Sequence, residues 1–396
     1  MIADSDSIPA FNDLKALIQF PTVSTTSNTE CCRWIEKRLE QLGFETEFLS
    51  YTDQWGEQKS CISGCLRPAN DCQSNGRGLA YFCHNDVVPV DSWSFPDAGP
   101  WQATRKDDRI YGRGSCDMKG SLACLLAAVE QSSGTLTAPL YVFCTADEEV
   151  GFHGARKIAN ESSLYKEVVT QQINSVIGEP TELRVVHAHK GGRILQFTAQ
   201  GRAAHSSTTE GINANFLMIP FLNELNQLLQ HLLSNSKYHD DRFDPSSITP
   251  NLILNDHTPA VNMTPAQSVA TVYFRTMPDI DVESIVKQLL DLAKVHQIKA
   301  EKTGGGDPVF TNPTSPFVQQ LLKLTGTAAS ETVSYGTDGG CFSELKNIVI
   351  FGPGSIRQAH TDDEYISIQQ LQLGVDMFEK LIALNCQDAA VRSPVC

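Results

Sequence analysis

Three short apolar runs of this chain lead directly into a histidine or a carboxylate, and this pattern constrains the fold most. The runs are 78–84, 140–146 and 174–178, and the polar residues at their ends are His84, Asp147 and Glu179. Such runs predict buried strands, and the Ala- and Leu-rich stretch 119–130 predicts a helix between two of them. Strands separated by helices indicate an α/β fold, with a mostly parallel sheet and helices on both faces.

The length of the chain and a change of pattern after Glu182 predict a second, smaller domain. With 396 residues the chain exceeds one ordinary hydrophobic core. Segment 267–275 alternates like a half-buried strand, and 212–233 and 282–295 have the apolar spacing of helices. We therefore predict a larger domain of 1–182 and 304–396, with an α+β domain of 183–303 inserted into it. Three consecutive glycines, 304–306, predict a flexible return to the larger domain.

Composition argues against several classes of function. The net charge of −15 disfavours binding to nucleic acid or to an anionic membrane, because both need clustered lysine and arginine. No apolar run approaches the ~20 residues that span a bilayer. The first ten residues contain no basic side chain, so no secretory signal is expected. The 12 scattered cysteines fit small buried residues in a reducing compartment, and a cytoplasmic protein is therefore expected.

Five candidate metal ligands lie just past probable strands, and they are His84, Asp117, Glu149, Glu179 and His360. Imidazole and carboxylate groups are the ligands of zinc in hydrolytic enzymes. Two Zn²⁺ ions carry four positive charges, which three carboxylates and a bridging hydroxide balance. Taken singly, each residue has a structural interpretation, since an aspartate before a helix is usually a cap and a lone histidine is usually structural.

Two further acids next to these ligands suggest catalytic roles. In Asp147-Glu148-Glu149, three adjacent carboxylates repel one another unless a cation or solvent compensates. One glutamate can bind metal while Glu148 faces the substrate as a base, and the alternative is an exposed acidic loop. Asp86 lies two residues from His84, so both side chains point the same way and the carboxylate can fix the imidazole tautomer. The alternative there is a polar strand end.

The strings around these residues resemble those of a known enzyme family. They are His84-Asn-Asp-Val-Val-Pro89, the stretch Tyr111–Gly120 that ends in Asp-Met-Lys-Gly, Thr145-Ala-Asp-Glu-Glu149 and Gly178-Glu-Pro180. They are similar to the co-catalytic zinc metallopeptidases that include acetylornithine deacetylase, succinyl-diaminopimelate desuccinylase, aminoacylase and glutamate-releasing carboxypeptidases. The resemblance implies a zinc-dependent hydrolase of linear amide bonds with two Zn²⁺ per chain, and Co²⁺ or Mn²⁺ can share such ligands.

The resemblance also implies a role for each residue. It places His84 and Glu179 on one metal, Glu149 and His360 on the other, and Asp117 between the two. It implies Glu148 as the general base, Asp86 as the residue that orients His84, and His205 as an oxyanion donor. A cis peptide bond is implied after Asp117. By the same analogy the inserted domain is a lid, and two chains form a homodimer through it.

Further strings indicate a substrate class within the family. His189-Lys-Gly191, the stretch Gly201–Ser206, and Gly352–His360 followed by Asp363-Glu-Tyr-Ile366 are most similar to acetylornithine deacetylases. This similarity implies conversion of N-acetyl-L-ornithine to ornithine and acetate, in arginine biosynthesis. A desuccinylase, acetylcitrulline deacetylase, aminoacylase or dipeptidase remains an alternative, because the metal ligands do not choose the acyl group. A catalytically dead binding protein is a further alternative, although every ligand and base position holds a suitable residue.

Four residues are candidates for binding a small-molecule N-acyl amino acid. Arg275 offers a cationic fork for the α-carboxylate, and its alternative is a surface salt bridge. Asn262 and backbone N–H groups near Gly354 would add hydrogen bonds. Asp338 would pair with the ornithine amine.

Overall fold

The computed structural model describes residues 8–69, 76–132 and 135–387, which form two compact units. Unit 1 contains the described residues up to Ala188, Val309–Glu331 and those from Thr337 onward. Unit 2 contains His189–Pro308 and Thr332–Gly336. Among the described residues, none of the helices combines the length and the apolar character that a membrane crossing requires.

Unit 1 is built on one large sheet whose centre is parallel. In spatial order its strands are β1 (Glu45–Thr52), β2 (Gln58–Leu66), β6 (Leu140–Thr145), β3 (Leu79–His84), β7 (Asn174–Ile177), β15 (Ile348–Ile350), β8 (Val186–His189) and β13 (Val309–Phe310), and β14 (Glu331–Val333) pairs with β8. Strands β6, β3, β7 and β15 are parallel neighbours, whereas β1, β2 and β8 join antiparallel. The predicted α/β fold with a mostly parallel central sheet is confirmed.

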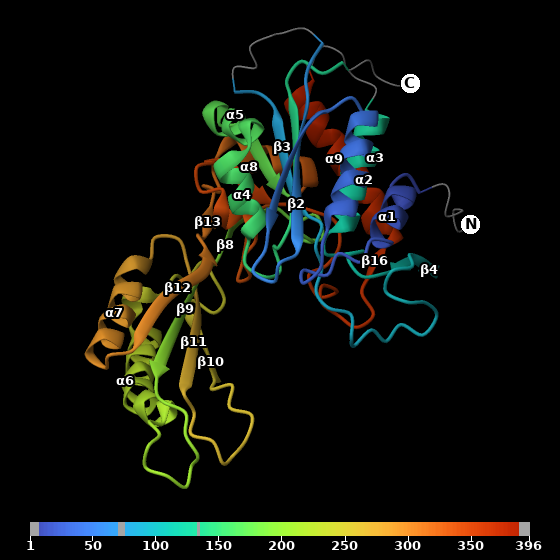
Figure 1. Cartoon of the computed structure of the whole chain (residues 1–396). Helices are drawn as coiled ribbons and strands as arrows, with labels where there is room; N and C mark the ends of the chain where they lie inside the picture. Colours follow the sequence, from blue (N-terminus) through green and yellow to red (C-terminus); the bar gives the residue numbers. More distant parts are fainter. Residues whose placement is uncertain (1–7, 70–75, 133–134, 388–396) are drawn as a thin grey trace. The chain divides into compact units, whose positions relative to one another are not determined.

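Helices cover both faces of this sheet (Figure 1). They are α1 (Phe11–Ile18), α2 (Thr29–Gln41), α3 (Lys119–Gln131), α4 (His153–Glu161), α5 (Ser163–Gln171), α8 (Pro316–Thr325) and α9 (Ile368–Cys386), with a short 3₁₀ helix η3 (Asp338–Cys341). Helix α3 packs against α1 and α9, while α4 and α5 pack against β2. Because the sheet is covered on both faces, β3 and β6 are buried along their whole length, which explains their uninterrupted apolar sequences.

A small antiparallel sheet in unit 1 joins two segments that are distant in the sequence. Its strands are β4 (Thr104–Lys106), β5 (Arg109–Tyr111) and β16 (Tyr365–Ser367). Strand β16 pairs with β5 so that Tyr365 lies opposite Tyr111. This pairing brings the chain just before β16 next to the loop that follows β5, and that loop contains Asp117.

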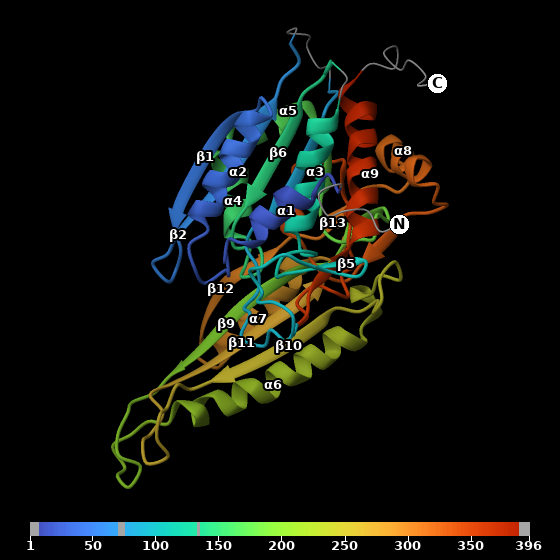
Figure 2. The same ribbon diagram turned by 90° about the vertical axis from the view of Figure 1, so that its right-hand side faces the viewer.

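Unit 2 is an antiparallel sheet covered by two helices (Figure 2). The strand order is β10 (Thr249–Asn255), β11 (Gln267–Thr276), β9 (Gly191–Gln200) and β12 (Lys299–Gly306). Helix α6 (Ala214–Ser234) packs on β9 and β11, α7 (Val282–Val295) packs on α6 and β12, and a 3₁₀ turn η2 spans Ser236–Tyr238. Phe197, Phe221 and Phe274 are fully buried in its core.

The prediction of a flexible return at residues 304–306 was wrong, because these glycines belong to β12 and pair with β9. A bulge lies between Lys302 and Gly304. A Cβ atom at Gly305 would lie 2.2 Å from the carbonyl oxygen of Gly192. The glycines therefore allow two backbones to approach closely, which is a role of glycine in strands that is difficult to separate from flexibility in a sequence.

Candidate metal centre

The carboxyl ends of the parallel strands β3, β6 and β7 bring polar residues together at one edge of the sheet in unit 1. In the register of β3 with β6, His84 lies opposite Thr145. Thr145 is two residues before Asp147, the first residue of the Asp147-Glu148-Glu149 turn. Strand β7 pairs with the other side of β3, so Glu179 follows at the same edge of the sheet. Ligands from adjacent strands meet at this edge because parallel strands end on the same side.

The first imidazole faces two carboxylates. The Nε2 atom of His84 lies 3.1 Å from Oδ1 of Asp117 and 3.6 Å from Oε1 of Glu179. His84, Asp117 and Glu179 are all buried. The peptide bond after Asp117 is cis, as the family resemblance implied.

The second imidazole faces the other oxygen of the same aspartate. The Nε2 atom of His360 lies 3.4 Å from Oδ2 of Asp117 and 3.0 Å from Oε2 of Glu149. Asp117 therefore directs one oxygen to each histidine, which is the arrangement that a bridging ligand requires. Ligand atoms of His84, Asp117 and Glu149 lie within 4.8 Å of one another. The structure thus brings together all five residues that the sequence predicted, and their roles as ligands remain predictions.

The electrostatics of this group suit a divalent cation. Burial raises the pKa of Glu148, Glu149 and Glu179, and the pKa of Glu179 is raised further by the charge of Asp117. Hydrogen bonds to Asp117 and Glu149 raise the pKa of His360 to about 10. Buried carboxylates this close repel one another, and a divalent cation among them would remove that repulsion. The donor set, two imidazoles and three carboxylates, fits zinc.

Asp86 contacts both the first imidazole and the turn that carries Glu148. The Nδ1 atom of His84 lies 2.9 Å from the backbone oxygen of Asp86 and 3.6 Å from its carboxylate. The carboxylate also accepts the backbone N–H groups of Glu148 (3.1 Å) and Glu149 (3.3 Å). The backbone oxygen of Asp86 therefore makes the shorter contact with the imidazole of His84. The carboxylate of Asp86 holds the backbone of the candidate base Glu148 and the candidate ligand Glu149.

Two buried residues near the centre were missed in the sequence. The carboxylate of Glu364 accepts the backbone N–H groups of Gly114, Cys116 and Asp117 and pairs with Arg113 at 2.9 Å. The ammonium group of Lys59 lies 3.1 Å from the carboxylate of Asp147. Nothing in the type of either residue indicates its role, because both depend on contacts with distant parts of the chain. The one indication in the sequence was that Glu364 lies in the string Asp363-Glu-Tyr-Ile366, which is part of the resemblance to the family.

Two of the predicted substrate-binding residues lie in unit 1, and both already have partners. Asp338 is buried, and its carboxylate accepts a hydrogen bond from the hydroxyl of Thr145. Burial raises the pKa of Asp338 to about 7. The N–H group of Gly354 donates to the side-chain oxygen of Gln370 at 3.1 Å. Their roles in binding substrate remain predictions, although neither group is free of partners within the protein.

Unit 2 holds the remaining three predicted residues and separates Arg275 from His205 and Asn262. The N–H of Ser206 donates to the carbonyl oxygen of Asn262 at 2.9 Å, so His205 and Asn262 lie side by side, and both are exposed. Arg275 lies near the other end of β11, opposite Gly192. The eight residue-to-residue steps of strand from Gln267 to Arg275 span ~26 Å. Unit 2 therefore does not bring Arg275 together with His205 and Asn262.

Comparison with known proteins places these features in one family. The model of the family described as peptidase family M20/M25/M40 matches residues 80–384. An acetylornithine deacetylase from Myxococcus xanthus is 33% identical over 395 residues, which cover 96% of this chain and 99% of that protein. An acetylornithine deacetylase from Pasteurella multocida (strain Pm70) is 32% identical over 409 residues, with coverage of 96% and 99%.

The fold is shared with solved structures of low sequence identity. A metallo-carboxypeptidase of the M20 family from Sulfolobus solfataricus superimposes with a TM-score of 0.68 at 17% identity, over 95% of this chain and 99% of that one. At this identity the likeness concerns the fold alone.

Proposed function

The chain belongs to peptidase family M20/M25/M40, and from this premise we propose that it converts N-acetyl-L-ornithine to ornithine and acetate. Membership makes the protein a metal-dependent hydrolase of amide bonds. The narrower proposal is carried by two relatives named acetylornithine deacetylase, at 33% and 32% identity over 96% of this chain. It includes a role in arginine biosynthesis and a cytoplasmic location.

The proposed metal is a pair of zinc ions, held by the five residues that gather in unit 1. The support is that Asp117 directs one carboxylate oxygen to His84 and the other to His360. Glu179 would complete the first site and Glu149 the second. Bound there, zinc supplies Lewis acidity that polarises the acyl carbonyl and lowers the pKa of a water molecule towards ~7.

The proposed work of the chain itself is to move one proton and to stabilise one developing charge. Glu148, with its backbone N–H held by Asp86, would take a proton from the attacking water. It would then return this proton to the nitrogen of the leaving amine. His205 is the proposed hydrogen-bond donor to the oxyanion, an interaction worth ~3 kcal/mol per well-placed donor.

The proposed recognition of substrate uses Arg275, Asn262, Gly354 and Asp338. Arg275 would bind the α-carboxylate of the amino acid, and Asn262 and the backbone near Gly354 would donate hydrogen bonds. Asp338 would pair with the terminal amine. Because Arg275 and Asn262 lie far apart within unit 2, each residue should be substituted singly, so that its own contribution to substrate binding is measured.

A homodimer formed through unit 2 is also proposed, without nucleic acid or membrane as a partner. Strand β10 is an edge strand, and Leu252, Ile253 and Leu254 are exposed on it. Phe216 and Ile219 are exposed on α6. An exposed apolar edge strand favours pairing with another chain.

The substrate is tested by measuring kcat/KM after reconstitution with zinc. The panel contains N-acetylornithine, N-acetylcitrulline, N-succinyl-diaminopimelate, N-acetylmethionine and a dipeptide. We expect N-acetylornithine to be preferred by about tenfold or more. Preference for another amide would replace the substrate and keep the family activity. No turnover of any amide by protein that has bound metal would overturn the proposal.

A further inference from the structure

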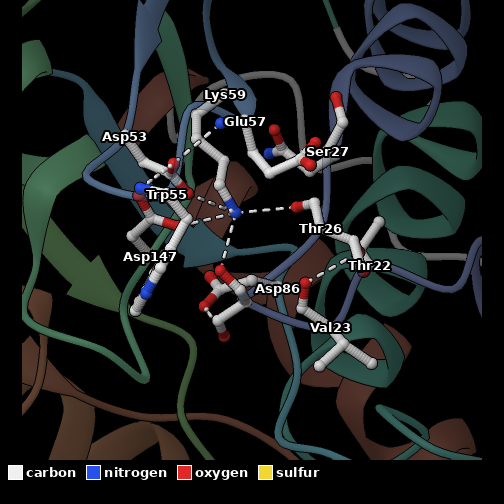
Figure 3. Close-up of polar contacts among 12 residues, drawn as sticks. Thr22, Val23, Thr26, Ser27, Asp53, Trp55, Glu57, Lys59, Asp86 and Asp147 are labelled. Carbon is white, nitrogen blue, oxygen red and sulfur yellow. Dashed lines mark hydrogen bonds and ion pairs between the residues drawn. The ribbon is translucent and has the colours of Figure 1, made fainter.

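Lys59 is a buried cation next to the turn that carries Glu148. It lies in β2 with only 1% of its surface exposed. Its ammonium group donates hydrogen bonds of 2.7 Å to the carbonyl oxygens of Ser24 and Thr26, and Figure 3 shows the contact with Thr26. It also lies 3.1 Å from the carboxylate of Asp147 and 3.5 Å from that of Asp53. Burying an ammonium group is costly unless such partners surround it, so this position is specified by its contacts.

One set of contacts leads from Lys59 to Glu148 through the preceding residue. Asp147 has a φ of 58°, a conformation that is uncommon for a residue other than glycine. Its carboxylate is held by Lys59 and by a 2.7 Å hydrogen bond from the hydroxyl of Tyr51. Its carbonyl oxygen accepts the N–H of Phe152 at 2.7 Å. The peptide that enters Glu148 is therefore fixed on both its side-chain and its main-chain sides.

A second set of contacts leads to the same turn from the opposite direction. The carbonyl oxygen of Ser24 accepts a hydrogen bond from Lys59, and the hydroxyl of Ser24 donates to the carboxylate of Asp86 at 2.7 Å. That carboxylate accepts the N–H groups of Glu148 and Glu149. Lys59 thus supports both the residue before the turn and the residue that binds its backbone.

We propose that Lys59 is a positioning residue for the catalytic turn, acting through Asp147 and through Ser24 and Asp86. It touches neither the metal ligands nor the substrate in this assignment. Its function is to fix the backbone of Glu148 and Glu149, so that the base and the adjacent ligand keep their relative position. This inference rests on the proposed role of Glu148. A displacement of ~1 Å in a catalytic group lowers turnover about 100-fold, so the effect is measurable.

The first test does not depend on activity. Hydrogen exchange is measured in the metal-free protein, on peptides that cover residues 145–152, for the wild type and for Lys59→Met. We expect the amides of Glu148 and Glu149 to exchange about tenfold faster in the variant, because neither Asp147 nor the backbone of Ser24, whose hydroxyl donates to the accepting carboxylate of Asp86, is then held by Lys59. Unchanged exchange in this segment would overturn the inference, whether or not the wild type hydrolyses an N-acyl amino acid.

The matched control is Arg38→Met, which also removes a cation that is paired with carboxylates. Arg38 pairs with Asp13 at 3.1 Å and with Glu130 at 2.7 Å. Glu130 lies at the C-terminal end of α3, whereas Asp117 precedes the N-terminal end of this helix. This variant should lose stability while the exchange of segment 145–152 and kcat stay as in the wild type. If it changes both as much as Lys59→Met does, the effect is general loosening and the inference fails.

The second test uses turnover of the best substrate in the panel. Lys59→Met should lower kcat about 30- to 100-fold, with KM changed less than about threefold and the metal content kept. Asp147→Asn, which keeps the shape of the side chain, should lower kcat similarly and also serves if Lys59→Met does not fold. The double variant should be little worse than Lys59→Met alone, because Asp147→Asn removes only a contact that Lys59→Met has already broken. Independent, multiplicative losses would overturn the proposed path through Asp147.

If the wild type turns over no amide while the exchange of segment 145–152 responds to Lys59→Met, the proposed function fails and the structural inference stands. If the panel is hydrolysed and both Lys59→Met and Asp147→Asn keep wild-type kcat, the inference fails and the proposed function stands.

Discussion

The loop that carries Asp117 is held by one buried carboxylate. Glu364 accepts three backbone N–H groups, from Gly114, Cys116 and Asp117, and it pairs with Arg113. All four partners are donors, so the site requires a group that only accepts hydrogen bonds. A glutamine has the same shape, but its NH₂ group would face donors. The chemistry of Glu364, and not only its size, is therefore what holds Asp117.

We accordingly expect Glu364→Gln to destabilise unit 1 by about 3–5 kcal/mol, the usual result of breaking a buried charged network. Metal affinity should fall about 10- to 100-fold, because Asp117 loses its support. Urea denaturation and metal titration measure the two effects. Glu161→Gln is the control, since its ion pair with Lys157 is a partly exposed pair four residues apart on α4, worth at most about 0.5 kcal/mol. A variant with wild-type metal affinity would show that Glu364 does not position Asp117.

Glu148 and Glu149 are adjacent, and the structure predicts opposite results for their substitution. Glu149 lies 3.0 Å from His360, and its ligand atom groups with those of His84 and Asp117 within 4.8 Å, whereas Glu148 is not in that group. Glu148→Gln should therefore keep the metal and lower kcat by about 10² to 10⁴, the contribution of a general base. Glu149→Gln should lose metal. Elemental analysis of metal content, combined with a measurement of turnover, distinguishes the two variants. Equal loss of metal in both would contradict the division of roles.

At the scale of elements, the sequence predicted the central strands well and failed where polar residues are buried. β3, β6 and β7 are apolar because both faces of the sheet are covered, and their ends located His84 and Glu179. β2 was missed because Lys59 and other polar residues interrupt its apolar pattern, although they are buried. The partners of Lys59 come from Ser24, Thr26 and Asp147. No local pattern contains these distant contacts, so the support of the turn was visible only in the fold.

Strand β10 carries the prediction for assembly. Among the strands that the structure describes, β10 pairs with β11 alone, and Ile253 on it is 58% exposed. If two chains pair along this edge, Ile253→Lys should convert the dimer to a monomer, because a lysine on an edge strand opposes pairing. Sedimentation velocity measures the change. Glu301→Lys on β12, the opposite edge of the same sheet, should leave the mass unchanged. A monomeric wild type, or an Ile253→Lys variant that still dimerises, would exclude this edge as the interface.

At the scale of the whole molecule, the candidate ligands belong to one unit only. His84, Asp117, Glu149, Glu179 and His360 all lie in unit 1, although they span most of the chain. Each unit also has a hydrophobic core of its own, around β3 and α3 in unit 1 and around Phe197 and Phe274 in unit 2. Metal binding should therefore be coupled to the unfolding of unit 1 and not to that of unit 2.

This coupling predicts two calorimetric transitions, of which a chelator shifts one. At a free metal concentration of ~1,000 times Kd, binding stabilises the folded state by about 4 kcal/mol, and a unit of this size then melts on the order of 10 °C higher. Removal of metal should lower that transition and leave the other in place. In Glu149→Gln, the response to the chelator should be much smaller, because one proposed ligand is missing. If the chelator moves both transitions equally, the two units unfold as one, and the metal stabilises the entire molecule.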